Sequence, residues 1–142
     1  VMAQISEHII VVKDYSGNAY LPDYLFNGIG TIEVGQGYQI KSNEAVSIEI
    51  CGDYAFPEDN TINLLAGWNL VGYLRTEPAD ITLVLSDIND AGNLIIVKDY
   101  IGNVYFPNLN YNGIGTMKAG QAYILKTDNA DLLQYLSNED SY

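Results

Sequence analysis

The side chains most capable of chemistry in this chain are its carboxylates, 18 in all against 6 lysines and arginines. Two carboxylates can act as acid and base in glycoside hydrolysis. The one acid that clearly recurs, however, is Asp14/Asp99, and both copies lie in turn-forming stretches. The single histidine, His8, has no G-x-S-x-G nucleophile signature to act on, so no catalytic triad is predicted. We therefore predict no catalytic residue and no enzyme activity.

Calcium is the metal ion that the oxygen-bearing side chains could bind, because it takes six to eight oxygen ligands, often from loops. The oxygen-rich positions are two matched turns and one acidic stretch, with Asp14, Asn18, Asp99, Asn103, Asp87 and Asp90 as candidate ligands. Their spacing does not fit an EF-hand, and Asp, Asn and Gly are also the residues that turns require. Turn formation is the simpler interpretation, and no cofactor is predicted.

Aromatic side chains could form a carbohydrate-binding face, because sugars stack on flat rings. The chain contains 12 tyrosines and one tryptophan, and the candidates for such a face are Tyr15, Tyr20, Trp68, Tyr100 and Tyr105. Tyrosine also fills half-buried positions of β-sheets. Core and hairpin packing is therefore the competing interpretation.

The other reactive or motif-like residues indicate structure rather than chemistry. Cys51 is the only cysteine, so no disulfide can form within the chain and no thiolate metal cluster is possible. The Gly-rich stretches 28–30 and 113–115 lack the Gly-Lys-Ser/Thr of a phosphate loop. Four of the six basic residues recur in matched pairs, which we expect to lie beside acids, with Lys–Asn crosslinking as the alternative: Lys13, Lys41, Lys98 and Lys126.

Three blocks of sequence occur twice with one constant spacing. Lys98 follows Lys13 by 85 residues, and the other matched positions keep this spacing without a gap. The matched blocks are 10–22 with 95–107, 27–31 with 112–116, and 35–41 with 120–126. Roughly half of the aligned positions are identical, which chance does not produce. The sequence therefore predicts a duplicated unit of about 85 residues.

The two copies differ in extent, because the first has almost no counterpart of the segments 62–74 and 80–88. We predict the second half of a first repeat module at residues 1–51, a connector at 52–61 and a complete second module at 62–142. If these 142 residues are the entire mature chain, the first module lacks its opening strand and is expected to expose a sheet edge; if they are a fragment of a longer array, this expectation lapses. Such an edge pairs readily with another chain.

The elements of the complete module can be predicted from residue patterns. Asp80 is a suitable helix N-cap, and Ile81, Val84, Leu85 and Ile88 follow at the spacing of one apolar helical face. Strands are expected at 70–74, 94–97, 104–106 and 122–125, and residues 132–136 fit either a strand or a short helix. The predicted fold class is β-dominated α+β: two small repeated modules of hairpins, the first incomplete, with one short helix in the complete copy.

The order of these motifs resembles a repeat module of secreted and cell-surface proteins of bacteria and archaea. Gly67-Trp68-Asn69-Leu70 matches the opening GWNL strand, and residues 120–124 match the closing PGxGYWI-type strand. Ala119 and Val34 stand where the closing motif has proline, and Ile124 and Gln39 stand where it has an aromatic residue. The resemblance implies a non-catalytic, often tandem module of an exported protein, located outside the cell or on its surface.

The net charge of −12 limits the partners that this chain can bind. Phosphate backbones and anionic membranes are repelled, so we predict no nucleic-acid binding, and no apolar run is long enough for membrane insertion. The charge does not exclude protein partners, self-association or glycan binding. The predicted function is a structural or adhesive extracellular module, with a filament assembled by strand completion between chains as one form. The alternative is a carbohydrate-binding module appended to a secreted enzyme.

Overall fold

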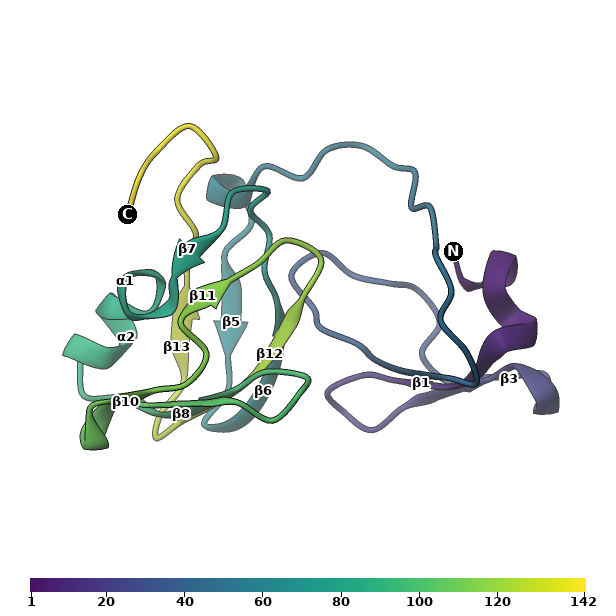
Figure 1. Ribbon diagram of the computed structural model, residues 1–142, viewed down its shortest axis with the longest axis horizontal. Helices are drawn as coiled ribbons and strands as arrows, with labels where there is room; N and C mark the ends of the chain where they lie inside the picture. The colour runs from purple at the N-terminus through teal and green to yellow at the C-terminus, as the bar shows by residue number, and fades with distance from the viewer.

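The computed structural model describes all 142 residues and contains two β-sheet bodies joined by an extended segment (Figure 1). The first body is a four-stranded antiparallel sheet in the order β3-β2-β1-β4. Its strands are β1 (Ile9–Lys13), β2 (Ala19–Leu21), β3 (Phe26–Asn27) and β4 (Gln39–Ser42), and it carries the 3₁₀ helices η1 (Met2–His8) and η2 (Pro22–Tyr24).

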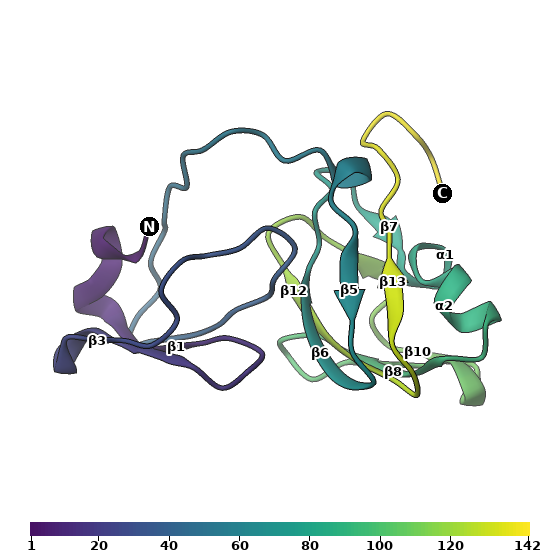
Figure 2. The ribbon, with the colours of Figure 1, turned by 180° about the vertical axis from the view of Figure 1, so that it is seen from behind.

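The second body is a five-stranded antiparallel sheet in the order β10-β9-β8-β12-β6. Its strands are β6 (Gly67–Gly72), β8 (Leu94–Lys98), β9 (Val104–Phe106), β10 (Tyr111–Asn112) and β12 (Ala122–Thr127). Two short ladders flank it: β5 (Ile62–Leu64) with β13 (Asp131–Leu133), side by side in Figure 2, and β7 (Ala79–Asp80) with β11 (Thr116–Met117). The 3₁₀ turns η3 (Pro57–Asp59) and η4 (Pro107–Leu109) complete the β-dominated α+β fold that the sequence predicts.

The predicted helix is present but divided into two short helices, α1 (Ile81–Val84) and α2 (Ser86–Asp90). Asp80 is the N-cap, because its Oδ1 accepts a hydrogen bond from the backbone N–H of Thr82 at 2.8 Å. Leu85 lies between the two helices with φ of −104°. The apolar face is nevertheless continuous, since all four predicted positions are buried: Ile81, Val84, Leu85 and Ile88.

One segment differs from the sequence-based expectation, and a second adopts one of its two predicted alternatives. The opening strand spans Gly67–Gly72 rather than 70–74, because all six of its residues pair with β12. The segment 132–136, which fits a strand or a helix by pattern, contributes to strand β13 because its backbone pairs with β5. Partner strands therefore set both boundaries.

The duplication is visible in the hydrogen bonds of the two hairpins. Asp14 accepts from the backbone N–H groups of Ser16 and Asn18 at 2.9 and 2.8 Å. Asp99 accepts from Ile101 and Asn103 at 3.0 and 2.8 Å. The asparagine loops match too, since Asn27 Oδ1 accepts from Gly30 and Asn112 Oδ1 from Gly115. Equal sequence spacing thus corresponds to equal local structure.

The two bodies differ greatly in their cores. The second body buries a cluster of 16 hydrophobic residues between its sheet, its two short helices and the β5–β13 ladder. The first buries three, Ile5, Ile9 and Val12. Because apolar burial is the main source of folding free energy, most of the stability of the chain resides in the second body.

The first body contacts the second through backbone pairing. The Gly37 N–H donates to the carbonyl of Leu70 at 3.1 Å, and the Gly72 N–H donates to the carbonyl of Gly35 at 2.9 Å. Residues 35–37 therefore extend the second sheet beyond β6, on the edge opposite β12. Gly37 is required there, because a Cβ at this position would lie 2.7 Å from Leu70 Cγ and 2.8 Å from the Ala122 side chain.

Replacing Gly37 with alanine is expected to weaken this joint between the bodies by about 1–3 kcal/mol, the usual cost of overpacking a close contact. Hydrogen–deuterium exchange should then rise at residues 35–37 and 70–72, while the core of the second body stays protected. Gly52→Ala is the matched control, because a Cβ at Gly52 meets nothing within 4 Å. Unchanged exchange in Gly37→Ala would show that the two bodies do not hold this contact in solution.

Candidate interaction site

The most distinctive surface of the molecule is the unpaired edge of β4. In the second body the equivalent strand β12 lies between β8 and β6. In the first body β4 has β1 on one side and no strand on the other, so the edge predicted from sequence is β4. All four residues of β4 are exposed, and Ile40 is 48% exposed where its counterpart Leu125 is 0% exposed. Such an edge presents backbone donors and acceptors to a further strand.

An open apolar cavity of about 370 Å³ lies on the core side of the same sheet. Its walls include Val12, Tyr20, Ile29, Ile32 and Tyr38. The counterparts in the second body all belong to or pack against the large core: Val97, Tyr105, Ile114, Met117 and Tyr123. There the helix α1 contributes the apolar side chains that complete the cluster. The cavity therefore lies where the first copy has no counterpart of α1.

The segment 46–50 has no regular structure, although its counterpart includes strand β13. In the second body β13 is held by pairing with β5, and Leu133 and Tyr135 are 1% and 0% exposed. In the first body no β5 counterpart is present, and Ile50, the counterpart of Tyr135, is 68% exposed. The β4 edge, the cavity and the exposed end of the segment 46–50 are together called here the open face.

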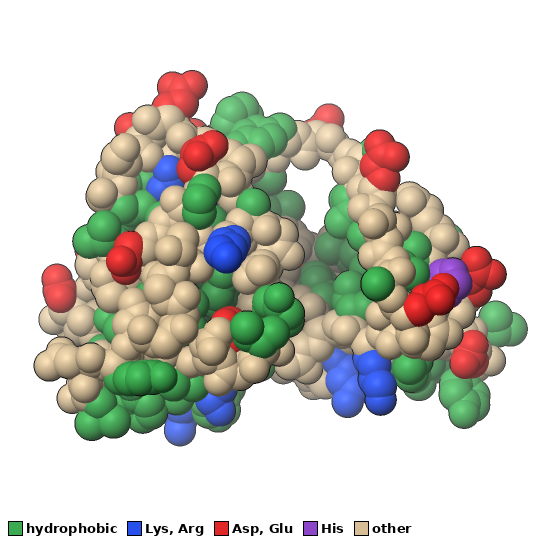
Figure 3. All heavy atoms as spheres, in the orientation of Figure 1, with side chains coloured by type: hydrophobic (Ala, Val, Ile, Leu, Met, Phe, Trp, Pro, Cys, Tyr) green, Lys and Arg blue, Asp and Glu red, His purple; other side chains and the backbone are tan.

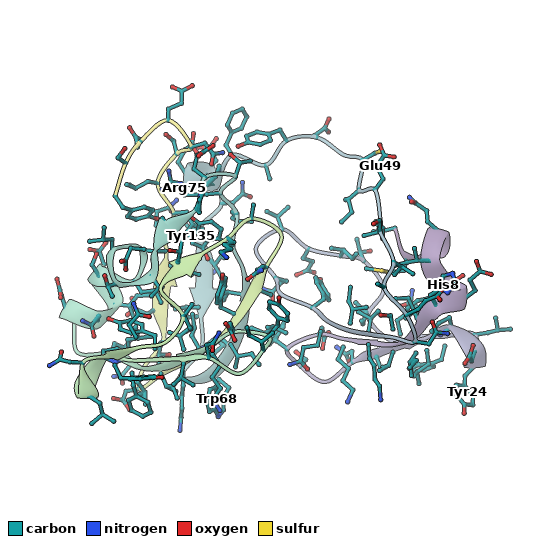
Figure 4. All side chains as sticks on the ribbon, in the orientation of Figure 1. His8, Tyr24, Glu49, Trp68, Arg75 and Tyr135 are labelled. Carbon is teal, nitrogen blue, oxygen red and sulfur yellow. The ribbon has the colours of Figure 1, made fainter.

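The repeated lysines lie on the face of each sheet that is opposite its core. In the second body the Nζ atoms of Lys98 and Lys126 lie 5.0 and 5.6 Å from the centre of the Trp68 ring. Neither forms an ion pair with an acid, so the expectation that they lie beside acids is wrong, and cation–π contact takes its place. Their counterparts Lys13 and Lys41 share one face of the first sheet, exposed and without an aromatic partner. Basic side chains gather along the lower edge of both bodies (Figure 3), where Figure 4 labels Trp68.

Four of the six calcium candidates form hydrogen bonds with one another inside the two matched turns. Asp14 Oδ2 accepts from Asn18 Nδ2 at 2.8 Å and Asp99 Oδ2 from Asn103 Nδ2 at 2.7 Å, so both asparagines direct amide hydrogens at the carboxylates. Desolvation raises the pKa of Asp14, but the hydrogen bonds from Asn18, Ser16 and Gly17 outweigh it and leave that pKa below its ordinary value. Asp87 and Asp90 lie exposed on α2. No three acidic, histidine or cysteine side chains form a group that could hold a metal.

The glycan candidates do not form one flat surface. Tyr105 is 6% exposed and part of the core, so it is unavailable for stacking, and Tyr20 lines the cavity. Tyr15 and Tyr100 are exposed at the tips of two different hairpins. Trp68 is half exposed, with Lys98 and Lys126 over its ring. These residues were grouped because they recur in both copies, but recurrence does not show whether a tyrosine lies on the buried or the exposed face of a sheet.

His8 and Cys51 both lie in the first half of the chain, near its surface. His8 Nδ1 is 2.8 Å from Glu44 Oε1, which links η1 to the segment after β4 (Figure 4 labels His8). Cys51 is exposed just before the connector, although its apolar-flanked sequence is typical of a small buried cysteine. In the stretch before it, Val46 and Ile48 are partly buried against the core of the first body, whereas Ile50 is 68% exposed.

The structure adds two features that residue patterns did not indicate. One is the cavity, whose residues are read from sequence as ordinary core. The other is Arg75, which is 4% exposed, donates from Nη2 to the carbonyl of Asp140 at 2.7 Å and lies 4.9 Å from the Tyr142 ring. Figure 4 places Arg75 beneath the C-terminal segment. Arg75 thus holds the C-terminal residues against the second body.

Comparison with known proteins gives no relative: no family model, no curated protein and no solved structure matches this chain. None of its helices has the length and apolar character needed to cross a membrane. The second body, which has the matching hairpin and closing strand, is therefore the structure with which the open face is compared.

Proposed function

We propose that this protein is a non-catalytic structural module of an extracellular or cell-surface assembly, and that neighbouring chains join through the open β4 edge. The observation that carries the proposal is the contrast between β12, paired on both sides, and β4, paired on one. The resemblance of the GWNL and closing motifs to exported repeat modules supports the location. The joint between the two bodies, which consists of backbone pairing, supports this mode of association.

The outward backbone groups of β4 can be assigned from the second body. There the Tyr73 N–H donates to the carbonyl of Gln121 at 3.0 Å, so Gln121 faces β6. Alternate residues of a strand direct their N–H and C=O groups to the same edge, so Tyr123 and Leu125 also face β6. Their counterparts Tyr38 and Ile40 therefore present N–H and C=O groups to solvent.

Light scattering over a range of concentrations tests the proposal. We expect an average mass that rises above 15.7 kDa at high concentration, because free edges pair with one another. Ile40→Pro should abolish the association, since proline removes an outward N–H without breaking the ladder to β1. Ile40→Ala is the matched control, because it removes the same apolar side chain but keeps the N–H, and it should still associate. A single monomeric species at every concentration would contradict the proposal.

A further inference from the structure

Each sheet carries two lysines on the face opposite its core. In the second sheet Lys98 pairs with Ile124 and Lys126 pairs with Ile96, so the two lysines are diagonal neighbours across the β8–β12 ladder. Residues at such positions have Cα atoms about 7–8 Å apart on the same face, within reach of long side chains. The second sheet therefore holds two ammonium groups close together on its outer face.

The first sheet repeats this arrangement. Lys13 pairs with Gln39 and Lys41 pairs with Val11 across the β1–β4 ladder, so these lysines are diagonal neighbours as well. Both of their side chains are exposed. The molecule thus has two matched pairs of lysines, called here the lysine pairs, one on the outer face of each sheet.

No acid of the chain forms an ion pair with these lysines. The two ion pairs of the molecule both involve His8. Asp14 and Asp99 each follow a lysine in the sequence, but their carboxylates accept hydrogen bonds inside the two hairpin turns. Because like charges at neighbouring positions of a sheet repel one another, an anion bound between the two lysines of a pair would relieve this repulsion.

Trp68 holds the lysine pair of the second sheet in place. It lies opposite Lys126 in the β6–β12 ladder, and the Nζ atoms of Lys98 and Lys126 are 5.0 and 5.6 Å from the centre of its ring. The negative face of the indole attracts both ammonium groups. Ordering of side chains opposes binding, so a lysine pair that a ring already orders is better prepared to bind an anion.

We propose that the two lysine pairs bind an anionic polysaccharide, whose carboxylate or sulfate groups lie between the ammonium groups of each pair. The inference goes beyond the proposed function, because it concerns the outer faces of the sheets and does not require pairing at the β4 edge. The second sheet provides the stronger site, since Trp68 orders its lysines, and the first sheet provides a second point of attachment.

The placement of the lysine pairs favours a long ligand. Figure 3 shows basic side chains along the lower edge of both bodies, with most of the acidic side chains in that view higher on the molecule. The pairs contain four of the six basic residues of the chain. The other two are Arg75, which is buried, and Lys118, which lies in the turn before β12. A polymer that contacts both pairs gains affinity from multivalency.

The outer face of the second sheet is less suited to a peptide. β8 and β12 each have a strand on both sides, so their backbone groups are engaged in the sheet and side chains alone are offered to a ligand. Peptides are bound mainly through a sheet edge or a groove, and acidic motifs through clusters of arginines. The only arginine of this chain, Arg75, is buried in another part of the body.

Charge density favours a polysaccharide over a nucleic acid. Double-stranded DNA carries one negative charge per about 1.7 Å of its axis, and the net charge of −12 opposes the approach of such a polymer. A polysaccharide with at most one anionic group per sugar carries fewer charges per unit length. The acidic remainder of the surface therefore repels it less.

The experiment measures binding of three polymers with one backbone to the intact chain by calorimetry: dextran, carboxymethyl dextran and dextran sulfate of low substitution. We expect binding of at least one charged dextran and none of dextran. The charged polymer that binds more tightly distinguishes carboxylate from sulfate as the recognised group. Binding should weaken at least about threefold when salt is raised from about 20 to about 200 mM, because exposed charges are screened.

Lysine variants locate the binding site. Lys126→Gln should weaken binding about two- to fivefold, the range expected for one exposed pair of opposite charges. Lys118→Gln is the charge-matched control and should bind as the original chain does. The double variant Lys98→Gln/Lys126→Gln should lose more affinity than Lys13→Gln/Lys41→Gln, because only the former lysines are held by a ring.

Variants of Trp68 test the ordering of the lysines. Trp68→Leu removes the ring and should weaken binding about twofold or more, whereas Trp68→Phe retains an aromatic face and should bind more tightly than Trp68→Leu. The circular dichroism spectrum of each variant shows that the fold is kept. Equal affinity of the original chain and Trp68→Leu would contradict this role of the ring.

Binding of a charged dextran that falls in Lys126→Gln and not in Lys118→Gln would support the inference. Equal losses in these two variants would mean that net charge alone governs binding, and the inference would be overturned. Polyglutamate that bound as tightly as the charged dextrans would overturn the polysaccharide as the partner. If neither charged dextran bound, the inference would fail, while the proposed function would still be decided by the Ile40→Pro-sensitive rise in mass.

Discussion

Truncating Leu125 to alanine is expected to lower the free energy of unfolding of the second body by about 2–5 kcal/mol, the usual cost of removing a fully buried leucine side chain. Leu125 is 0% exposed in the middle of β12, opposite Val97 of β8 and Asn69 of β6. Neighbouring strands on both sides prevent the site from collapsing around the lost atoms. Urea unfolding followed by the fluorescence of Trp68, the only tryptophan, measures the effect directly.

The same change at the matched position of the first body should cost far less. Ile40 is 48% exposed on an unpaired strand, so Ile40→Ala is expected to change stability by about 0.5–1 kcal/mol or less. Hydrogen–deuterium exchange at β1 and β4 monitors this body, which lacks tryptophan. If Leu125→Ala and Ile40→Ala lowered the free energy of unfolding by equal amounts, the β4 edge would be covered in solution, and the proposed open face would be wrong.

The second large effect is loss of structure at alkaline pH, driven by tyrosines of the second body. Burial raises the pKa of Tyr73 from 10.0 to about 12, and burial also raises the pKa of Tyr105, Tyr123 and Tyr135. The phenol protons are in use: the Tyr73 hydroxyl donates to the carbonyl of Glu77 at 2.7 Å, and the Tyr135 hydroxyl donates to that of Gly72 at 3.1 Å. Ionisation would remove these donors and bury charges.

The sign of the pH effect follows from the raised values. The folded protein holds these phenols in the neutral form more strongly than the unfolded chain does, so their contribution to stability is complete below pH 10, the ordinary pKa. The contribution of Tyr73 is lost as the pH rises from 10 through about 12, and the contributions of the other buried tyrosines are lost above their ordinary pKa as well. We expect cooperative unfolding of the second body in this range, detected by circular dichroism together with the ultraviolet absorbance of tyrosinate.

A phenylalanine series separates buried from exposed tyrosines. Tyr135→Phe keeps the edge-to-face packing against Tyr73, whose ring centre is 5.3 Å away, and removes one titrating group, so the alkaline midpoint should move upward. Tyr24→Phe, at a side chain that is 79% exposed and projects away from the first body in Figure 4, should leave the midpoint unchanged. Gradual titration of all tyrosines near pH 10 without unfolding would contradict the expected burial.

The open face gives the sequence duplication a physical meaning. Both copies contain the same type of hairpin and closing strand, yet only the body that contains residues 62–85 forms a large core. The connector passes above an opening between the two bodies (Figure 3). The closing strand of the first body, β4, lies at the edge of its sheet with all four residues exposed.

Several features were determined by the sequence itself, because short-range chemistry specifies them. Asp80 is an N-cap because its carboxylate reaches an N–H two residues ahead, and Asp14 and Asp99 form matching turns because each carboxylate reaches N–H groups two and four residues ahead. The apolar spacing of α1 and α2 and the hairpin signals around Gly102 act over the same short distances.

Features that depend on contacts between distant residues were decided only by the tertiary structure. Tyr105 and Tyr100 are equally plausible glycan contacts in sequence, but one is 6% and the other 75% exposed, because Tyr105 lies on the buried face of β9 and Tyr100 lies at the tip of a hairpin. Lys98 and Lys126 lie over Trp68 because β8 and β12 lie next to β6. Matching hairpins give a dense core in one body and an open cavity in the other, because burial depends on the segment that packs against them.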